Sequence, residues 1–518
     1  MKKFIGCVLV LSVLFCSCSK TSKPANDYKD LEPTGSITEA SDITPTVPPK
    51  KEPEVFETQG GDPSRLEGYV NMVEKFTLEG YVNPETLTNS IAAAKDLLSK
   101  KTATQEEYDQ AMDDIRYSLV HLDDGSGFIS VSHLEQKETW PDAFTFFDGT
   151  KVETSEDWEK RKQEISNLYQ YYMYGMARDG SLETIHYEGS ESQMKIAVTV
   201  GEVTKDFTVS VAVPDSDKVS MPEGGWPVIL AFGRFAQTEY ANNRGYAVIT
   251  LDTSQIATDD MSRNGIFYQL YPYGKKWNEQ TGALMAWGWG FSKIIDALEQ
   301  GAGEEYQINP ANTIVTGVSR WGKAAYVAGA FDSRIRITAP SCSGAGGVAA
   351  FRYLSQGKTY DLSGVGASNQ YTMTANEQLD NLQSSAERHW FNDNFTHIAN
   401  NNALPFEQYQ LAALCTDENR YLFIIGSYIY EDWVNAPAMW ASFLAAKQML
   451  HQVGIEDHIA MNMHKEGHAV IDEDVVYLLD YSDYHLYGKE VKSNLDDLNH
   501  SLYELDVNYD PFFDQFQY

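Results

Sequence analysis

A serine in a glycine-containing turn is the first residue whose surroundings suggest chemistry. Ser319 lies in Gly317-Val-Ser-Arg-Trp-Gly322, between a β-branched run at 313–316 and an Ala-rich segment at 324–330. This order predicts a strand, a tight turn and a helix, which is the form of a nucleophile elbow, although the closing glycine comes one place late. Glycine neighbours allow a serine to occupy a strained turn, and N–H groups at the helix start can bind an oxyanion. Ser319 is therefore the candidate nucleophile.

A nucleophilic serine needs a base, which the elbow folds supply from later in the chain. Histidine suits this role because it can accept and return a proton near neutral pH. His468 lies in Lys465-Glu-Gly-His468, directly after the last predicted strand at 459–463, where such a fold places its base. His464, at the tip of that strand, is the second candidate.

Alternating strands and helices must hold these residues in place. We predict an α/β fold over 134–518, with an antiparallel first pair of strands and a mainly parallel remainder covered by helices, which is the layout of an α/β-hydrolase. The predicted strands are the apolar or alternating runs 196–200, 207–213, 228–232, 247–251, 313–316, 336–338, 421–425 and 459–463.

The N-terminal part is predicted to contain three segments of different character. Residues 1–18 read as a signal peptide, and Cys18 resembles a bacterial lipoprotein cleavage site, with cleavage without a lipid as the alternative. Residues 19–63 are rich in Ser, Thr, Pro, Lys and Glu, which predicts a disordered linker. Residues 64–122 show helical spacing, with a Pro start at Pro84 and a capping box at Thr104. We therefore expect a secreted or cell-surface protein with a small three-helix module.

The composition excludes some classes of function. The chain has 518 residues, with 74 acidic against 40 basic residues and a formal net charge of -34, which argues against nucleic-acid binding. It contains no HExxH or Cys-rich metal pattern, so we expect neither a metal nor an organic cofactor. The sequence leaves open a pairing of Cys342 with Cys415.

The region from about residue 140 to 481 resembles carbohydrate esterase family 15, the glucuronoyl esterases. The helical module resembles FIVAR-type units, for which we prefer a spacer role over glycan binding. Ser-Arg-x-Gly-Lys at the elbow is the most specific of the matches to the esterase family. The matching segments are 158–161, 174–175, 265–268, 281–289, 317–323, 331–334, 343–347, 389–391, 404–406 and 467–468, together with Arg352 and Trp433.

This resemblance implies roles for individual residues. Ser319 would be the nucleophile and His468 the base, while the guanidinium of Arg320 would stabilise the oxyanion as charge develops on the carbonyl oxygen. The resemblance also implies contacts with the sugar for four further residues: Lys323, Glu387, Trp433 and Gln378.

The acid that completes the triad is the one departure from the family pattern. Many members place it after the strand that follows the elbow, where this chain has Cys342, and a thiol cannot replace the acid. Some bacterial members place it after a later strand, and here Glu431 and Asp432 follow the run at 421–425. We favour Glu431 and keep Asp432 as the alternative.

These observations predict a monomeric serine esterase that acts on esters of (4-O-methyl-)glucuronic acid, as in lignin–glucuronoxylan cross-links. An acetyl or feruloyl xylan esterase is the alternative enzyme, and a glycan-binding protein with a decayed site is the alternative outside catalysis. The expected partner is the ester substrate, and the expected contact with a membrane is the lipid at Cys18. The sequence does not specify the alcohol of the ester.

Overall fold

The computed structural model describes residues 61–75, 78, 81–100, 102–365, 370–501, 503 and 505. The predicted signal peptide with Cys18, and nearly all of the predicted linker, lie outside the described residues. Among the residues that are described, no helix is long and apolar enough to cross a membrane.

Three helices form at the positions where the sequence predicts a helical module. They are α1 (Ser64–Val73), α2 (Pro84–Ser99) and α3 (Gln105–Val120). Pro84 begins α2, and Thr104 caps α3 in a reciprocal capping box with Glu107, as expected from the residue types. Apolar residues at helical spacing, including Leu87 and Ile115, are buried in a small core of their own.

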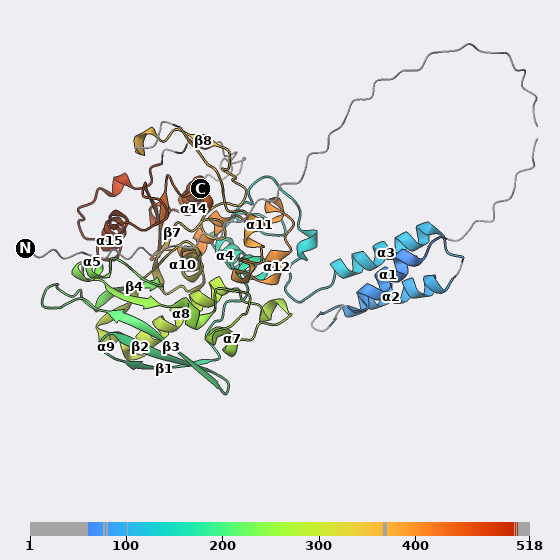
Figure 1. Cartoon of the computed structure of the whole chain (residues 1–518), viewed down its shortest axis with the longest axis horizontal. Helices are drawn as coiled ribbons and strands as arrows, with labels where there is room; N and C mark the ends of the chain where they lie inside the picture. Colours follow the sequence, from blue (N-terminus) through green and yellow to red (C-terminus); the bar gives the residue numbers. More distant parts are fainter. Residues whose placement is uncertain are drawn as a thin grey trace, which may run out of the picture. The chain divides into compact units, whose positions relative to one another are not determined.

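The region after the helical module is built on a nine-stranded sheet with the order β1-β2-β3-β5-β4-β6-β7-β10-β11. Figure 1 labels β1 to β4 and β7 of this sheet. β1, β2, β3 and β5 pair in antiparallel fashion, and all pairs from β5 to β11 are parallel. The sequence predicted this division but missed β1. The strands are β1 (Glu183–Gly189), β2 (Gln193–Val200), β3 (Val203–Ala212), β4 (Trp226–Phe232), β5 (Ala247–Leu251), β6 (Ile308–Val318), β7 (Ile335–Ser341), β10 (Tyr421–Ser427) and β11 (Ile459–His464), with a separate hairpin of β8 (Thr359–Tyr360) and β9 (Tyr371–Thr372).

Helices cover both faces of the parallel part, so its central strands are apolar throughout. All seven residues of β4 are buried: Leu230 packs in the cluster that contains α8, α10 and α14, and Ile229 packs in the cluster that contains α5 and α15. This is the arrangement of a doubly covered parallel sheet. The helices of this region are α4 (Ser155–Tyr169), α5 (Thr238–Asn243), α6 (Thr253–Ile256), α7 (Ile266–Leu270), α8 (Ala283–Ala297), α9 (Gly303–Tyr306), α10 (Arg320–Phe331), α11 (Leu379–Leu382), α12 (Asp393–Thr396), α13 (Ala412–Cys415), α14 (Ala436–Gln452) and α15 (Asp472–Tyr487).

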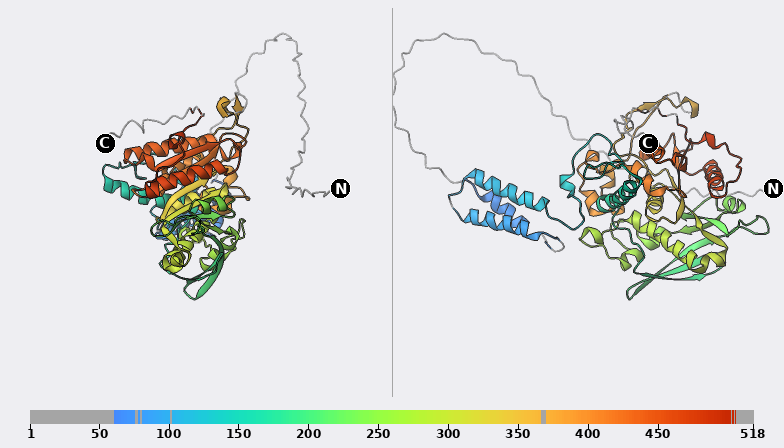
Figure 2. Two further views of the ribbon diagram at one scale, coloured as in Figure 1. Left: turned by 90° about the vertical axis from the view of Figure 1, so that its left-hand side faces the viewer. Right: turned by 180° about the vertical axis from the view of Figure 1, so that it is seen from behind.

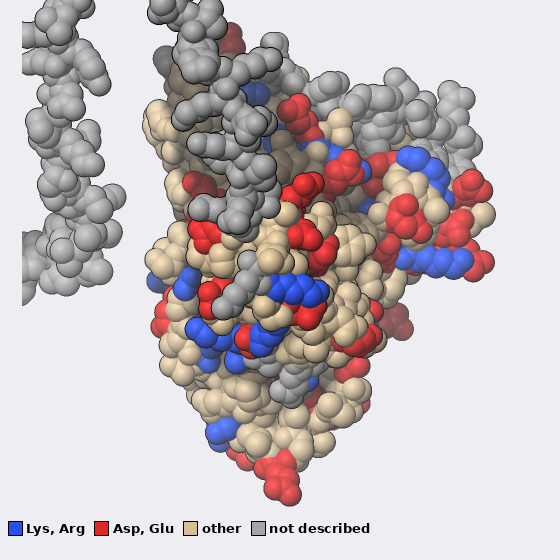
Figure 3. Space-filling view, turned by 90° about the vertical axis from the view of Figure 1, so that its right-hand side faces the viewer, with Lys and Arg blue, Asp and Glu red and all other residues tan. Residues whose placement is uncertain are grey.

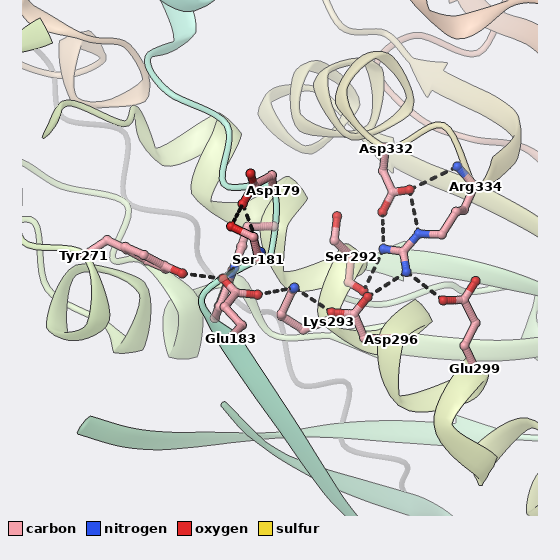
Figure 4. Close-up of polar contacts among 11 residues, drawn as sticks. Asp179, Ser181, Glu183, Tyr271, Ser292, Lys293, Asp296, Glu299, Asp332 and Arg334 are labelled. Carbon is pink, nitrogen blue, oxygen red and sulfur yellow. Dashed lines mark hydrogen bonds and ion pairs between the residues drawn. The ribbon is translucent and has the colours of Figure 1, made fainter. Parts of the chain in front are cut away.

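A buried ion network ties the antiparallel end of the sheet to the helix that packs beside the elbow helix. Lys293 of α8 pairs with Glu183 at the start of β1 and with Asp296, and Glu183 also accepts hydrogen bonds from Tyr271 and Trp289. Arg334, in the turn before β7, pairs with Asp296 at 2.6 Å (Figure 4). In the strand order, β1 and β11 are the two edge strands of the sheet. In the right-hand view of Figure 2, the green strands near the first edge and the orange to red segments near the second lie on opposite sides of this region.

The acidic surface is mixed rather than uniformly negative on the face drawn in Figure 3. Lys and Arg side chains lie among Asp and Glu side chains there. The protein also forms exposed ion pairs, such as Lys160 with Glu156. Interspersed charges of this kind favour solubility and give this face no basic stripe of the kind that binds nucleic acid.

Candidate active site

Ser319 occupies the sharp bend that the sequence predicts. It follows β6 directly, has φ 62° and ψ -127°, and is followed at once by α10. A positive φ is unfavourable for a residue with a Cβ, so the surrounding structure must hold it. Its N–H donates to the carbonyl of Ser341 at 3.0 Å, and its own carbonyl accepts from N–H of Lys323 at 2.9 Å.

The two glycines of the elbow are needed for close packing. A Cβ on Gly317 would lie 2.5 Å from the carbonyl oxygen of Trp321, and a Cβ on Gly322 would lie 2.4 Å from that of Ser341 in β7. Both of these atoms belong to the backbone of a regular element, so a side chain at either glycine would force α10 or β7 to shift. The closing glycine therefore comes one place late because residue 322 is the one that meets the neighbouring strand.

His468 and Glu431 come together at the ends of two neighbouring strands. β10 and β11 run parallel with Ser427 opposite His464, so the loops that follow them leave the same edge of the sheet. Nδ1 of His468 lies 2.6 Å from Oε1 of Glu431. The other oxygen, Oε2, accepts from the N–H of Ser427 at 3.1 Å. Glu431 is buried, whereas the side chain of His468 is 41% exposed, so the imidazole can reach both a buried carboxylate and a substrate.

Burial raises the pKa of Glu431, and its hydrogen bonds with His468 and Cys342 act in the opposite direction. A carboxylate so placed orients the imidazole and stabilises its protonated form. Burial also raises the pKa of the Cys342 thiol, which therefore stays protonated. Cys342, Glu431 and His468 are ligand types for zinc, and their ligand atoms lie within 4.8 Å of one another. In this structure the three residues are joined by hydrogen bonds instead, because Glu431 contacts both Nδ1 of His468 and the protonated thiol of Cys342.

The second candidate base, His464, shapes the loop that carries His468. Its Nδ1 accepts from the N–H of Glu466 at 3.1 Å, and its Nε2 lies 3.1 Å from the carbonyl of Ala469. Burial lowers the pKa of His464, which suits a neutral ring that accepts through one nitrogen and donates through the other. The N–H of Gly467 donates to Oγ of Ser427 at 3.1 Å. The two ring nitrogens of His464 thus contact the backbone on both sides of His468, at Glu466 and at Ala469.

The alternative acid, Asp432, contacts a different segment. Its Oδ1 accepts from the hydroxyl of Tyr371 at 2.6 Å, and its Oδ2 accepts from the N–H and hydroxyl of Thr374. The two cysteines do not pair: Cys342 and Cys415 are free and buried.

Arg320, the first residue of α10, lies beside the serine and pairs with Asp259. Its guanidinium lies 5.4 Å from the centre of the Trp390 ring, and its side chain is 46% exposed. Asp259 also accepts from Nε1 of Trp390 at 2.7 Å and lies 2.9 Å from Nε2 of His389. Burial alone would raise the pKa of Asp259, but these hydrogen bonds outweigh it and hold that pKa well below its ordinary value.

Lys323 is buried one turn further along α10. Its Nζ donates to the carbonyls of Ser343 and Ala345 at 2.7 and 2.6 Å and to the carboxylate of Glu377 at 2.6 Å. An ammonium has three donors, so each already has an acceptor in the protein. A direct bond from Lys323 to a sugar hydroxyl would require one of these bonds to break.

The other predicted sugar contacts lie around this pair. Burial and the nearby charge of Glu377 raise the pKa of Glu387 to about 7. Oε2 of Glu387 is buried and has no hydrogen-bond partner within the described part of the chain. Trp433 is 46% exposed, and its carbonyl accepts from the N–H of Glu377 at 2.6 Å. Gln378 follows Glu377 and forms the N-cap of α11.

Comparisons with known proteins identify the family of this chain. Residues 196–454 match the family model described as "Glucuronyl esterase, fungi". The chain belongs to the glucuronyl esterase family. Among its relatives, the 4-O-methyl-glucuronoyl methylesterase of Schizophyllum commune is 32% identical over 322 residues, which cover 61% of this chain and 74% of that protein.

Two further proteins are more similar to this chain. A multidomain esterase of Ruminococcus flavefaciens is 49% identical over 395 residues, which cover 75% of this chain. The chain spans about half the length of that relative, since the match covers 51% of it. The solved carbohydrate esterase family 15 glucuronoyl esterase from Caldicellulosiruptor kristjansonii is 39% identical, with a TM-score of 0.66 over 74% of this chain and 98% of that one. The predicted family and its α/β-hydrolase fold are therefore confirmed.

Three residues that lie at this site were not singled out from the sequence: Asp259, Glu377 and Trp390. Asp259 lies 61 positions before its partner Arg320, in a loop without a strand or helix pattern. Glu377 stands next to Gln378, which the sequence did single out, and Trp390 lies within a matching segment. Position in a family motif was thus the available signal for Trp390, and adjacency to Gln378 was the signal for Glu377.

Proposed function

We propose that the chain is a glucuronoyl esterase that hydrolyses esters of glucuronic or 4-O-methyl-glucuronic acid by a Ser319–His468–Glu431 mechanism. The observation that carries the proposal is the 2.6 Å contact between His468 Nδ1 and Glu431 Oε1, in a chain whose serine lies on a strained elbow. The name of the Schizophyllum commune relative, a 4-O-methyl-glucuronoyl methylesterase, supports glucuronic acid as the acyl part of the substrate.

The proposed chemistry follows from what each group can do. Ser319 attacks the ester carbonyl while His468 accepts its proton, and the protonated imidazole is stabilised by Glu431. The carbonyl oxygen becomes negative, and the guanidinium of Arg320 stabilises it; Arg320 has five N–H donors, so its bond to Asp259 leaves capacity for this role. His468 then returns the proton to the alcohol, and water activated by the same imidazole releases the free acid.

Glu387 and Trp433 are proposed to contact the sugar. The carboxyl of Glu387 has a pKa of about 7 and an unpartnered buried oxygen, so near neutral pH it can donate to or accept from a hydroxyl. The half-exposed ring of Trp433 can pack against the sugar. Lys323 is proposed to act by holding Glu377 and the 343–345 turn, with its ammonium in the interior.

Hydrolysis of methyl and benzyl esters of 4-O-methyl-glucuronic acid tests the proposal. The wild type should turn over both esters, and Ser319→Ala should lose activity while keeping its fold by circular dichroism. Thr253→Ala is a control for the loss of a hydroxyl near the elbow, since Thr253 lies on α6 and its hydroxyl accepts a hydrogen bond from Nε1 of Trp321. Equal activity of the wild type and Ser319→Ala would reject the nucleophile, and faster turnover of acetyl or feruloyl xylan than of glucuronate esters would reject the substrate class.

We propose a secreted or surface location with a lipid at Cys18. The lipoprotein-like sequence around Cys18 supports this location. Mass spectrometry of the mature N-terminus in a bacterial host would reveal a diacylglyceryl cysteine, and Cys18→Ser should release the protein from the membrane fraction. An unmodified N-terminus in the membrane-bound wild type would contradict the proposal.

A further inference from the structure

Tyr430 is an exposed aromatic residue in a strained backbone, directly before the proposed triad acid. Its side chain is 77% exposed, more than any other large hydrophobic side chain in the described part of the chain. Its φ is 60°, a conformation that is unfavourable for a residue with a large side chain. Strained residues of this kind tend to lie at functional sites.

The backbone of Tyr430 is nevertheless held firmly. Its N–H donates to the hydroxyl of Tyr371 at 3.2 Å, and that hydroxyl donates to Asp432 at 2.6 Å. Asp432 in turn accepts two bonds from Thr374. The exposed ring therefore projects from a fixed support, so a ligand that packs against it would not have to order the loop.

Tyr430 also lies against the loop that carries the proposed base. A Cβ placed on Gly467 would lie 3.4 Å from Cβ of Tyr430 and 3.6 Å from its carbonyl oxygen. Gly467 precedes His468, and Tyr430 precedes Glu431, whose carboxylate contacts the imidazole. The tyrosine is thus connected to the imidazole through both loops.

The position of the imidazole decides which half of the ester lies near it. In acyl transfer, the base returns its proton to the leaving alcohol, so that oxygen must lie at the imidazole. The acyl half, with its developing oxyanion, lies toward Arg320 on α10. A side chain that packs on the His468 loop is therefore on the alcohol side of the ester.

We propose that Tyr430 forms a subsite for the alcohol and selects aromatic alcohols over small aliphatic ones. This inference rests on the proposed function and adds to it a residue that contacts the alcohol half of the ester. A rigid exposed ring offers a flat face and a polar edge, and aromatic pairs are favourable beyond their buried area. From the usual strength of such a pair, removal of the ring should lower the preference for an aromatic alcohol about twofold to tenfold.

The test compares kcat/KM for three glucuronate esters that differ in the alcohol: methyl, benzyl and cyclohexylmethyl. Methanol and benzyl alcohol are leaving groups of similar basicity, so their ratio reports contacts rather than reactivity. The variants are Tyr430→Asn, in which Asn tolerates the left-handed backbone, and Tyr430→Phe, which keeps the ring. Tyr484→Asn is the matched control, because Tyr484 is a half-exposed tyrosine on α15.

We expect the benzyl-to-methyl ratio to fall about twofold to tenfold in Tyr430→Asn and to stay near the wild-type value in Tyr430→Phe and Tyr484→Asn. An unchanged ratio in Tyr430→Asn, or equal losses for all three esters, would overturn the subsite. Equal losses for the benzyl and cyclohexylmethyl esters would overturn the preference for aromatic alcohols. These failures leave methyl ester hydrolysis by the wild type in place, whereas its absence would overturn the proposed function itself.

Discussion

Nε1 of Trp390 donates a hydrogen bond of 2.7 Å to Oδ1 of Asp259. The same carboxylate pairs with Arg320 and lies 2.9 Å from Nε2 of His389. The ring of Trp390 lies 5.4 Å from the guanidinium of Arg320 and 5.8 Å from the ammonium of Lys323. Asp259 and Trp390 thus form a support for the two cations of α10, from segments that lie far apart in the chain.

The first prediction concerns this support. In Asp259→Asn, the amide oxygen can still accept from Trp390, but the charge opposite Arg320 is lost. A charge-assisted hydrogen bond contributes about 1.5–3 kcal/mol, so we expect kcat/KM to fall about 10- to 100-fold. Asp260→Asn is the control, because Asp260 is exposed and bonds within its own turn. If Asp259 acts through the guanidinium, Asp259→Asn should have no further effect in an Arg320→Ala background, and additive losses would contradict this.

The second prediction separates the two candidate acids. Glu431→Gln should lower kcat on the order of 10³- to 10⁴-fold, because the amide cannot stabilise the imidazolium. Asp432→Asn should lower kcat less than about tenfold, since Asp432 binds Tyr371 and Thr374. Steady-state kinetics on the methyl ester measure both, and a larger loss in Asp432→Asn would reverse the assignment.

Short sequence patterns predicted those parts of the fold that depend on neighbouring residues in the chain. β4 is an unbroken apolar run because both of its faces are covered, and the elbow is visible because Gly317 and Gly322 must approach other backbone segments. β1 was missed because it is a half-exposed edge strand that begins with Glu183, whose partners lie about a hundred residues away. Its pairing depends on contacts that no window of the sequence contains.

The candidate site was predictable to the same extent. Ser319, Arg320 and His468 follow from motif and position, whereas the choice between Glu431 and Asp432 depends on the direction of a loop. Tyr430, directly before Glu431, has a left-handed backbone conformation. Such a conformation is hard to predict from the sequence for a residue other than glycine. The acceptors of Lys323 come from residues 343, 345 and 377, so its burial depends on the folded loops.

The third prediction concerns the stability that Lys323 provides. Lys323→Met should leave the buried carboxylate of Glu377 without its partner and lower the free energy of unfolding by about 3–5 kcal/mol. The double variant Lys323→Met, Glu377→Gln should recover part of this loss, because the uncompensated charge is gone. Urea unfolding measures both, with Lys492→Met as an exposed control that should stay within about 0.5 kcal/mol. A double variant less stable than Lys323→Met would contradict a role for the buried charge.

The fourth prediction concerns the pH dependence of stability. Burial raises the pKa of Asp474, at the start of α15, from 3.8 to about 7. Between these values the folded protein keeps a proton that the unfolded chain has lost, so the free energy of unfolding falls as pH rises from about 4 to 7 and then levels off. Asp474→Asn stays neutral, so its loss between pH 5 and pH 8 should be smaller than that of the wild type by roughly 2–3 kcal/mol. Urea unfolding at the two pH values checks this, with the exposed neighbour Asp472→Asn expected to behave as the wild type. Equal losses in Asp474→Asn and the wild type would show that Asp474 is ionised in the folded protein at pH 5, and its buried carboxyl would then need stronger donors than the N–H of Ile471 and the amide of Asn462.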